Sequence, residues 1–369
     1  MASRSAIALS RATLTFALRA ELMLFCRMLA ESTLNIEINC SNLWPWQAGH
    51  AGSVFKTSAS NCSPQSRHLK SYKGTFTLLL GHIYYANLKF LMATTDFTAH
   101  RAAFRKLHES GCFVIPNPWD VGTARYLRHL GFRALATSSA GFTFSRGLPD
   151  AAAPRDTVLN HIAEIVGSVD LPVNADFESG YAHDPPGVAE SVRLCVETGV
   201  AGLSIEDSTG DRLRPLYDLP VAVERMKVAR AAIGTSGVLL VGRAECFLVG
   251  HAEPLKEAIR RLQAYAEAGA DVLYAPGVRE RADIQAIVAA VSPKPVNVLM
   301  SANTGLMVAD LAEMGVRRIS VGSSLARAAW GGFIRAAKAI AEEGSFAGFD
   351  SCAPFAELNG FFREDLKNR

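Results

Sequence analysis

The stretch 171–198 reads LPVNADFESGYAHDPPGVAESVRLCVET, and it holds one complete repeat of the pattern that decides the fold. Residues 171–175 form a short apolar run with the length of a buried strand, and residues 187–198 have the apolar spacing of an amphipathic helix. A polar loop that contains Asp176 and Glu178 joins them. A strand that is apolar on both faces and is followed by a helix is typical of a parallel sheet covered by helices.

The same unit recurs along the chain. Eight apolar runs are predicted to be strands, at 112–115, 133–138, 171–175, 201–205, 237–242, 271–275, 295–299 and 317–321. Helical patterns lie between them, at 120–130, 156–168, 187–198, 220–232, 254–268, 279–291 and 304–314. Eight strand–helix repeats over about 230 residues predict a closed (β/α)8 TIM-type barrel. A doubly wound sheet is the alternative, but the first strand-to-helix loop, IPNPWDVGTA, lacks the glycine-rich dinucleotide motif. The apolar C-terminal segment is expected to add helices that pack on a neighbouring subunit.

Composition narrows the choice of partners. The chain has 369 residues, of which 49% are hydrophobic and 20% charged, with a formal net charge of only +3. Since no basic stripe interrupted by aromatic residues is present, we expect a small-molecule substrate and not a nucleic acid. Seven cysteines lie far apart, without the spacing of a disulfide framework or a metal site. This favours reduced thiols and a cytoplasmic protein.

Residues 1–91 differ from the rest of the chain. They contain three acidic residues against nine Lys or Arg, and they have no sustained strand or helix period. Arginines interrupt the apolar runs, so neither a secretory signal nor a membrane span is expected. A transit-type presequence for organelle import is one interpretation. We favour the other, in which Met92 is the true start and 1–91 is a poorly structured extension, so that the barrel domain occupies 92–369.

Chemistry in barrels of this type takes place at the carboxyl ends of the strands. There the sequence places Asp176 and Glu178, followed by Glu206 and Asp207 at the end of the next strand. Neighbouring carboxylates repel each other unless a cation lies among them, and a hard divalent cation with oxygen ligands is the usual solution. The two acidic pairs therefore predict a Mg²⁺ site, in which Mn²⁺ could substitute. Loop capping is the simpler interpretation of either pair alone.

Two further features belong to the same end of the barrel. The small residues Ser138 to Gly141 follow the second predicted strand, either as a tight turn or as a place where backbone N–H groups approach an anion. Arg243 ends the fifth predicted strand. It either forms an ion pair with Glu206 or Glu245 or contacts an anionic substrate.

Six motifs, in this order, resemble those of the isocitrate lyase / phosphoenolpyruvate mutase superfamily: PNPWDVGTARYLRHLGFRALATSSAG, GLPD, VNADFESGYAHDP, GLSIEDSTGD, LVGRAECF and AYAEAGADVLYAPG. The resemblance covers about 115–335. It implies a (β/α)8 barrel that binds Mg²⁺ and forms or breaks a C–C or P–C bond next to an enolate of pyruvate. It also implies a homo-oligomer, a tetramer or dimer, with C-terminal helices swapped between subunits.

The resemblance assigns roles to individual residues. It implies a metal site made of Asp176 as direct ligand together with Glu178, Glu206 and the outer-sphere acid Asp150. It implies that Ser138, with the backbone N–H groups of Ser139 and Ala140, binds the substrate carboxylate, and that Asp176 also faces the substrate. Arg243 would contact both the carboxylate and the developing oxyanion, so that Arg243, Ser138 and Glu206 are the catalytic residues. Glu178 departs from the aspartate of the family's D-x-D motif.

The loop after the fourth predicted strand departs further. Lyases of the superfamily carry a K-K/R-C-G-H motif there, whereas this chain reads EDSTGDRLRPLYDLP. Isocitrate lyase activity is therefore not expected, and the proton donor is unassigned. We expect a Mg²⁺-dependent lyase that cleaves a C–C bond in, or decarboxylates, a small 2-oxo or 2-hydroxy di- or tricarboxylic acid. A mutase or hydrolase acting on a P–C bond and a non-catalytic ligand-binding paralogue are the alternatives.

Overall fold

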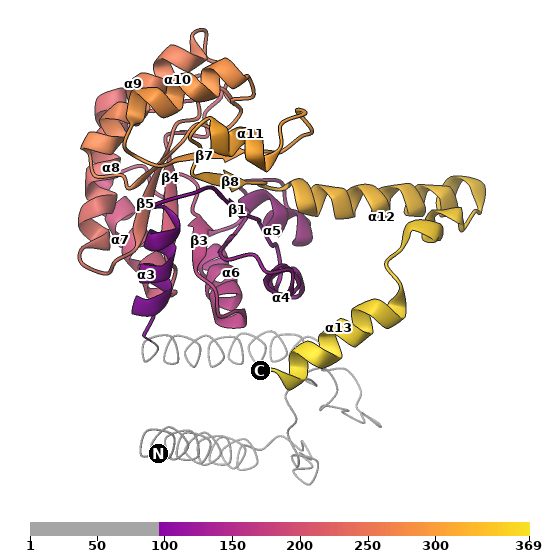
Figure 1. Cartoon of the computed structure of the whole chain (residues 1–369). Helices are drawn as coiled ribbons and strands as arrows, with labels where there is room; N and C mark the ends of the chain where they lie inside the picture. Colours follow the sequence, from indigo (N-terminus) through magenta and orange to yellow (C-terminus); the bar gives the residue numbers. More distant parts are fainter. Residues whose placement is uncertain (1–95) are drawn as a thin grey trace, which may run out of the picture. The chain divides into compact units, whose positions relative to one another are not determined.

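In the computed structural model, residues 96–369 are described, and their centre is a barrel of eight parallel strands (Figure 1). The strands follow the order β1-β8-β7-β6-β5-β4-β3-β2, and a hydrogen bond from the Ala136 N–H to the Pro116 carbonyl joins β2 to the end of β1. The strands are β1 (Phe113–Ile115), β2 (Leu135–Ala136), β3 (Val173–Asp176), β4 (Gly202–Glu206), β5 (Leu239–Arg243), β6 (Val272–Tyr274), β7 (Val296–Leu299) and β8 (Arg318–Ser320).

Helices alternate with these strands and cover the outside of the barrel (Figure 1). They are α4 (Val121–His129), α5 (Ser139–Ser145), α6 (Arg155–Ser168), α7 (Pro185–Glu197), α8 (Leu219–Ile233), α9 (Pro254–Glu267), α10 (Arg281–Val291) and α11 (Val308–Glu313). The predicted (β/α)8 barrel is confirmed, and each predicted strand overlaps an observed one. The predictions concerning 1–91 lie outside the described residues.

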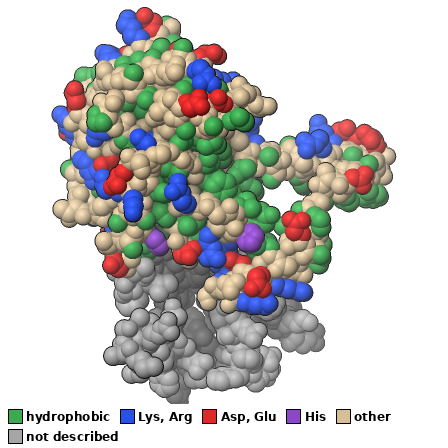
Figure 2. Space-filling model, viewed as in Figure 1, with side chains coloured by type: hydrophobic (Ala, Val, Ile, Leu, Met, Phe, Trp, Pro, Cys, Tyr) green, Lys and Arg blue, Asp and Glu red, His purple; other side chains and the backbone are tan. Residues whose placement is uncertain are grey.

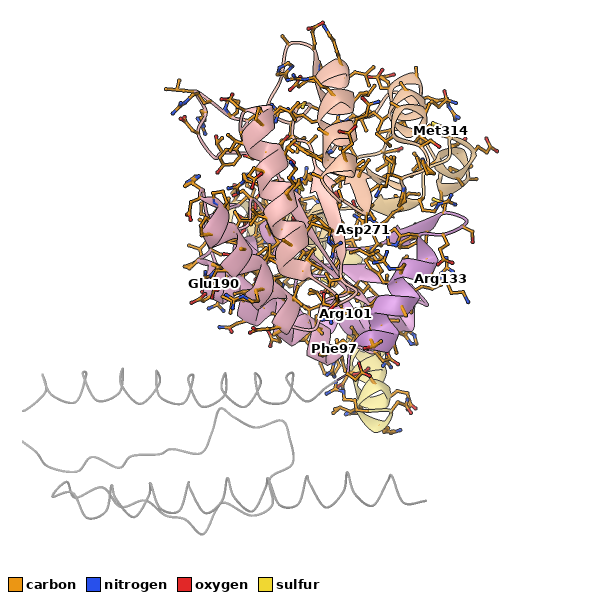
Figure 3. The ribbon with its side chains drawn as sticks, turned by 90° about the vertical axis from the view of Figure 1, so that its left-hand side faces the viewer. Phe97, Arg101, Arg133, Glu190, Asp271 and Met314 are labelled. Atoms are coloured by element: carbon orange, nitrogen blue, oxygen red, sulfur yellow. The ribbon has the colours of Figure 1, made fainter. Side chains whose placement is uncertain are left out.

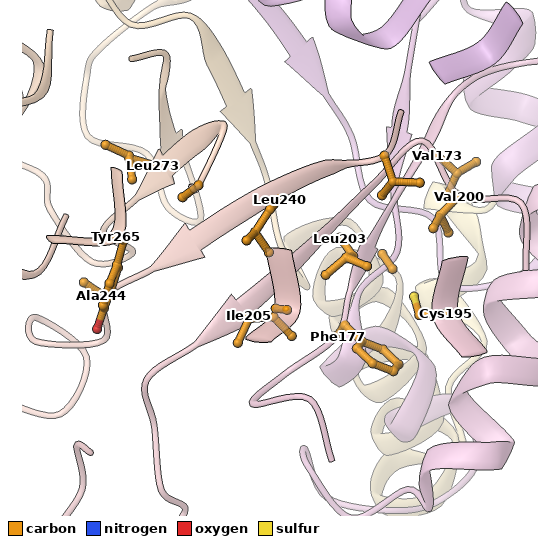
Figure 4. Close-up of a cluster of buried hydrophobic side chains, with 14 of the residues drawn as sticks. Val173, Phe177, Cys195, Val200, Leu203, Ile205, Leu240, Ala244, Tyr265 and Leu273 are labelled. Atoms are coloured by element: carbon orange, nitrogen blue, oxygen red, sulfur yellow. The ribbon is translucent and has the colours of Figure 1, made fainter. Parts of the chain in front are cut away.

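The core has two parts because successive residues of a strand point to opposite sides of the sheet. Between the sheet and the helices lie Leu203, Ile205 and Leu240, all fully buried against the surrounding helices (Figure 4). Inside the barrel lies a second apolar cluster, which includes Phe113 and Val241. Strands β1, β5 and β6 are therefore largely apolar on both faces, whereas β3, β7 and β8 also direct Asn174, Asn297 and Arg318 into the barrel.

Helix α3 (Thr98–Leu107) contributes to this inner cluster from outside the sheet. Its Phe104 is fully buried among the inward-facing side chains of the strands. Its Arg101, labelled in Figure 3, donates hydrogen bonds to the carbonyls of Val200, Val196 and Ser236. These carbonyls belong to the segments that precede β4 and β5, so α3 fixes the amino-terminal end of the barrel, opposite the site described below.

The C-terminal segment forms α12 (Ser324–Glu343), the 3-10 helix η2 (Ala347–Ser351) and α13 (Phe355–Lys367). Figure 1 shows α12 leaving the barrel and α13 returning toward α4. Asp365 of α13 accepts a hydrogen bond from Arg125 of α4 at 3.0 Å. In contrast, α12 exposes large apolar side chains, among them Trp330, Phe333 and Ile334. The extra C-terminal helices are present as predicted, and their exchange between subunits stays a prediction.

The surface carries both signs of charge. On the face shown in Figure 2, Lys and Arg side chains are interspersed with Asp and Glu, without a continuous basic stripe. Within 96–369, none of the helices combines the length and the hydrophobicity that crossing a bilayer requires.

His161 of α6 stacks on Phe142 of α5 with ring centroids 4.0 Å apart, and its buried Nε2 has no hydrogen-bond partner among the described residues. Burial lowers the pKa of His161 from 6.5 to about 4. The unfolded chain therefore takes up this proton near pH 6.5 and the folded protein only near pH 4, so stability is full above pH 6.5 and falls as the pH drops toward 4. The folded state should lose about 2 kcal/mol through this group between pH 7 and pH 5.

The measurement is urea unfolding of the wild type and of His161→Leu at both pH values. The wild type should lose about 2 kcal/mol more than the variant, which has no titrating group at this position. An equal loss in both proteins would assign the acid sensitivity to other residues.

Candidate active site

Arg243 is the centre of a charged cluster at the carboxyl ends of β3, β4 and β5. Its Nη1 lies 3.2 Å from Oδ1 of Asp176 and 3.1 Å from Oε2 of Glu206. Its Nε donates to Oε1 of Glu245. Burial acts to lower the pKa of Arg243, but Glu206 and Glu245 outweigh it and raise the pKa well above the usual value. The guanidinium is therefore a permanent cation held by carboxylates from three successive strand ends.

The single positive charge of Arg243 only partly neutralises the carboxylates around it. Burial raises the pKa of Glu206 well above its usual value, although the charge of Arg243 opposes the shift. The pKa of Glu245 is raised for the same reason. Side chains with exposed fractions of 16% for Glu206 and 7% for Glu245 have little water to stabilise their charge. The cluster therefore favours the binding of additional positive charge.

Asp176 connects this cluster to the start of α5. Its Oδ2 accepts a hydrogen bond from the Ser139 N–H at 3.0 Å, while its own N–H donates to Oγ1 of Thr137 at 2.9 Å. Ser138 caps α5, because its Oγ accepts from the Gly141 N–H at 3.1 Å. The small residues 138–141 are thus the first turn of a helix, and the Ser139 N–H that we assigned to the substrate carboxylate points at Asp176. Ala140 follows in the same turn, where N–H groups have no acceptor within the helix.

Asp150 and Glu178 lie on the loops beside Asp176. Partial desolvation raises the pKa of Asp150, and the charge of Asp176 raises it further. Burial raises the pKa of Glu178 to about 7, although Oε1 of this residue accepts a hydrogen bond from the Tyr181 hydroxyl at 2.8 Å. Glu178 and Tyr181 also have positive φ angles, 47° and 56°, which residues other than glycine rarely adopt. The structure therefore brings the predicted metal acids Asp150, Asp176 and Glu178 within electrostatic reach of one another.

The residues of this cluster suit a hard divalent cation by their chemistry. Within 96–369 no group of three or more His, Cys, Asp or Glu side chains is arranged as a ready ligand set, since Arg243 is shared between Asp176 and Glu206. Mg²⁺, however, commonly takes only one or two protein carboxylates and completes its shell with water and substrate oxygens. Asp176 would hold the ion directly, with Asp150, Glu178 and Glu206 around it.

Asp207 does not join Glu206 in the cluster, so the predicted pair of adjacent acids is wrong in this respect. Its side chain is fully buried on the opposite side, where Oδ2 accepts from Arg261 at 3.0 Å and from the Tyr265 hydroxyl. Its Oδ1 accepts from the Glu245 N–H at 2.8 Å. The reason is the two-residue period of a strand, which directs neighbouring side chains to opposite faces. Asp207 positions the backbone of Glu245 instead of binding a ligand.

Asp207→Ala should lower the free energy of unfolding by about 3 kcal/mol or more, because it leaves Arg261 and the buried Tyr265 hydroxyl without their acceptor. Urea unfolding measures the loss. Asp170→Ala is the control, since Asp170 pairs with Arg128 at the surface and such pairs contribute less than about 1 kcal/mol. Equal losses in the two variants would contradict a supporting role for Asp207.

Two residues of the site were not among the predicted site residues. Glu245 follows Arg243 by two positions, and the strand period alone indicates that both side chains share a face. Tyr274 ends β6, and its ring centroid lies 5.4 Å from the Arg243 guanidinium carbon. Nothing in its apolar strand distinguishes Tyr274 from a core residue, so the sequence gives no comparable signal.

The loop after β4, which differs from the lyase motif, folds back on itself. Ser208 and Leu216 form an isolated antiparallel bridge, and the Leu213 side chain at the tip is 90% exposed. At the base of the loop the Tyr217 hydroxyl lies 2.6 Å from Nδ1 of His183, which belongs to the loop after β3. The two loops that border Asp176 and Glu206 are therefore joined to each other.

Comparison with known proteins agrees with this arrangement. Residues 104–341 match the family model described as phosphoenolpyruvate phosphomutase. The chain belongs to this family. A solved structure of a Burkholderia cenocepacia J2315 protein described as a lyase/mutase shares 46% identity with a TM-score of 0.70, over 73% of this chain and 98% of that one.

Two curated members of the wider superfamily show the range of reactions. The 2-methylisocitrate lyase of Escherichia coli (strain K12) is 32% identical over 160 residues, which are 41% of this chain and 53% of that protein. The oxaloacetate decarboxylase of Paraburkholderia xenovorans (strain LB400) is 28% identical over 239 residues, or 62% of this chain and 76% of that protein. These relatives of the phosphoenolpyruvate phosphomutase family support an enzyme of the lyase or decarboxylase kind that acts on small carboxylic acids.

Proposed function

We propose that this protein is a Mg²⁺-dependent lyase that cleaves a C–C bond in, or decarboxylates, a small 2-oxo or 2-hydroxy di- or tricarboxylic acid and releases a pyruvate-like enolate. The observation that carries the proposal is the arrangement around Arg243. A permanent cation lies among Asp176, Glu206 and Glu245 at the carboxyl end of the barrel, beside the first turn of α5. Such a site can hold an anionic substrate and a divalent cation together.

Some residues of the site bind the substrate, and others stabilise the negative charge of the enolate. Ser138, Ala140 and the first turn of α5 bind the substrate carboxylate. Arg243 binds the oxygen on which the enolate charge grows, and a donor aimed at developing charge lowers the barrier more than it lowers the energy of the bound substrate. When bound, Mg²⁺ supplies charge neutralisation at the chelating oxygens of a 2-oxo acid. Glu245 keeps the fork of Arg243 in place and is itself held by Asp207.

Among the reactions considered, decarboxylation agrees best with the composition of the loop after β4. A lyase that releases a second organic product needs an acid to protonate it, and the segment 207–218 contains neither Cys nor His. Loss of CO₂ from an oxaloacetate-like acid needs no protein acid at that step. The 28% identical oxaloacetate decarboxylase supports the same choice.

A panel of substrates tests the proposal directly. Purified protein with Mg²⁺ is offered oxaloacetate, substituted malates, 2-methylisocitrate and phosphonopyruvate. Formation of pyruvate or another new 2-oxo acid is measured, and for phosphonopyruvate also formation of phosphoenolpyruvate. We expect turnover of at least one 2-oxo or 2-hydroxy acid, which EDTA abolishes and Mg²⁺ or Mn²⁺ restores. Turnover of phosphonopyruvate alone would establish P–C bond chemistry instead. Binding of oxalate without any turnover would support a non-catalytic ligand-binding protein.

A further inference from the structure

Arg318, on β8, is a buried cation inside the barrel. It is 3% exposed, and its Nε donates to Oδ1 of Asn297 at 2.8 Å while its Nη1 donates to Oδ1 of Asn174 at 3.4 Å. No carboxylate of the described residues forms an ion pair with it. Burial lowers the pKa of Arg318 to about 10, so the guanidinium stays charged at neutral pH.

The position of Arg318 relates it to the candidate active site. Asn174 precedes Asp176 by two residues on β3, so the two side chains share the inner face of the barrel about 7 Å apart along the strand. The guanidinium that reaches Asn174 therefore lies one layer below Asp176. Its other partner, Asn297, is in register with Tyr274, which is in register with Arg243.

Within the described part of the chain, the surroundings of Arg318 contain no group that neutralises its charge. Its polar neighbours are the uncharged side chains Asn174 and Asn297, and the inward-facing residues Phe113 and Val241 belong to an apolar cluster. A buried cation with only amide partners costs stability, because amide oxygens do not replace the hydration of a full charge. A buried cation that costs stability beneath an acidic site is a candidate for a functional role.

We propose that Arg318 is a positioning residue of the reaction, whose charge below Asp176 stabilises the negative charge that develops on the enolate. It acts through the field of its charge and does not touch the substrate, and Asn174 and Asn297 hold the guanidinium in place. The inference rests on the proposed function, since it concerns the same site. In a low-dielectric interior, a unit charge one strand layer away changes the energy of an anion substantially, whereas the same charge at the surface is screened.

The test compares two variants of opposite kind. Arg318→Lys keeps the charge and loses the planar fork, whereas Arg318→Gln keeps a donor for Asn297 and loses the charge. Each is measured for kcat and KM on the best substrate of the panel, for melting temperature, and for oxalate affinity by calorimetry with Mg²⁺ present. Oxalate is a dianion that mimics the enolate, so its binding is a readout independent of turnover.

Arg318→Gln should lower kcat and weaken oxalate binding, each by roughly 10-fold or more, with KM and melting temperature changed little. Arg318→Lys should keep kcat and oxalate affinity within about 3-fold of the wild-type values, even if its melting temperature differs. The inference would be overturned if the two variants had equal kcat and equal oxalate affinity. It would also be overturned if Arg318→Gln had a lower melting temperature but normal kcat and normal oxalate affinity. A wild type that binds oxalate without turnover would refute the proposed function and leave the affinity comparison to decide on Arg318. A wild type that shows neither would overturn both.

Discussion

Replacing Asp176 with alanine is expected to reduce the kcat/KM of the metal-dependent reaction by about 10³-fold or more. Asp176 is the acid that faces Arg243, Asp150 and Glu178 at once, and a metal ion that stabilises developing charge contributes several kcal/mol to the transition state. The melting temperature should change little. The variant loses the hydrogen bonds from Ser139 and Arg243, but it also relieves the repulsion between neighbouring carboxylates.

Steady-state kinetics over a Mg²⁺ titration, with thermal unfolding of the same samples, measures both effects. The surface variant Asp170→Ala, which lies in no part of the site, is the control and should match the wild type. An Asp176→Ala protein that keeps a normal dependence on Mg²⁺ would disprove the metal assignment.

Arg243→Lys is expected to lower kcat/KM by roughly 10²-fold, the usual scale for losing one donor to an oxyanion. A lysine keeps the charge near the acids, but its single ammonium lacks the planar fork that would hold Glu245 through one nitrogen and a substrate oxygen through another. The ion-pair interpretation of Arg243 is confirmed by the structure. The kinetics of Arg243→Lys test whether the arginine also contacts the substrate.

The comparison that separates the two roles is kcat/KM against melting temperature. If Arg243 only neutralises the three acids, Arg243→Lys should retain most of its activity and Arg243→Ala should chiefly lose stability. If the guanidinium binds the substrate, activity should fall steeply in Arg243→Lys while the melting temperature changes by a few degrees. Full kcat/KM in Arg243→Lys would remove this residue from the catalytic mechanism.

The barrel was predictable because its strands are short, mostly apolar runs separated by helical patterns, and few other folds require eight such repeats. Because the strands were predicted correctly, their carboxyl ends were too, and Asp176, Glu206 and Arg243 lie at those ends. Helix α5 was not predicted, because residues 139–145 contain serine, threonine and glycine that by themselves favour a turn, and the cap by Ser138 is visible only in three dimensions.

For three residues, Asp207, Tyr274 and Arg318, the surroundings of the side chain were not predicted from the sequence. Asp207 carries the same charge as Glu206, and only the strand period separates a residue of the site from one of the core. Tyr274 and Arg318 belong to the inner face of the barrel, where strands far apart in sequence meet. The two adjacent arginines of RRISV do not reveal by themselves which one faces the barrel interior.

The anchoring of the loop after β4 has a consequence for how substrate preference could change. The Tyr217 N–H bonds to the Asp207 carbonyl and the Tyr217 carbonyl accepts from Arg261, so both ends of the segment 208–216 are attached to one buried group. The residues between Asp207 and Tyr217 can therefore be replaced as one segment without displacing Glu206, Arg243 or Glu245. Substitutions within 208–216 are therefore expected to alter the surface of this loop while the buried charges of Glu206, Arg243 and Glu245 keep their arrangement.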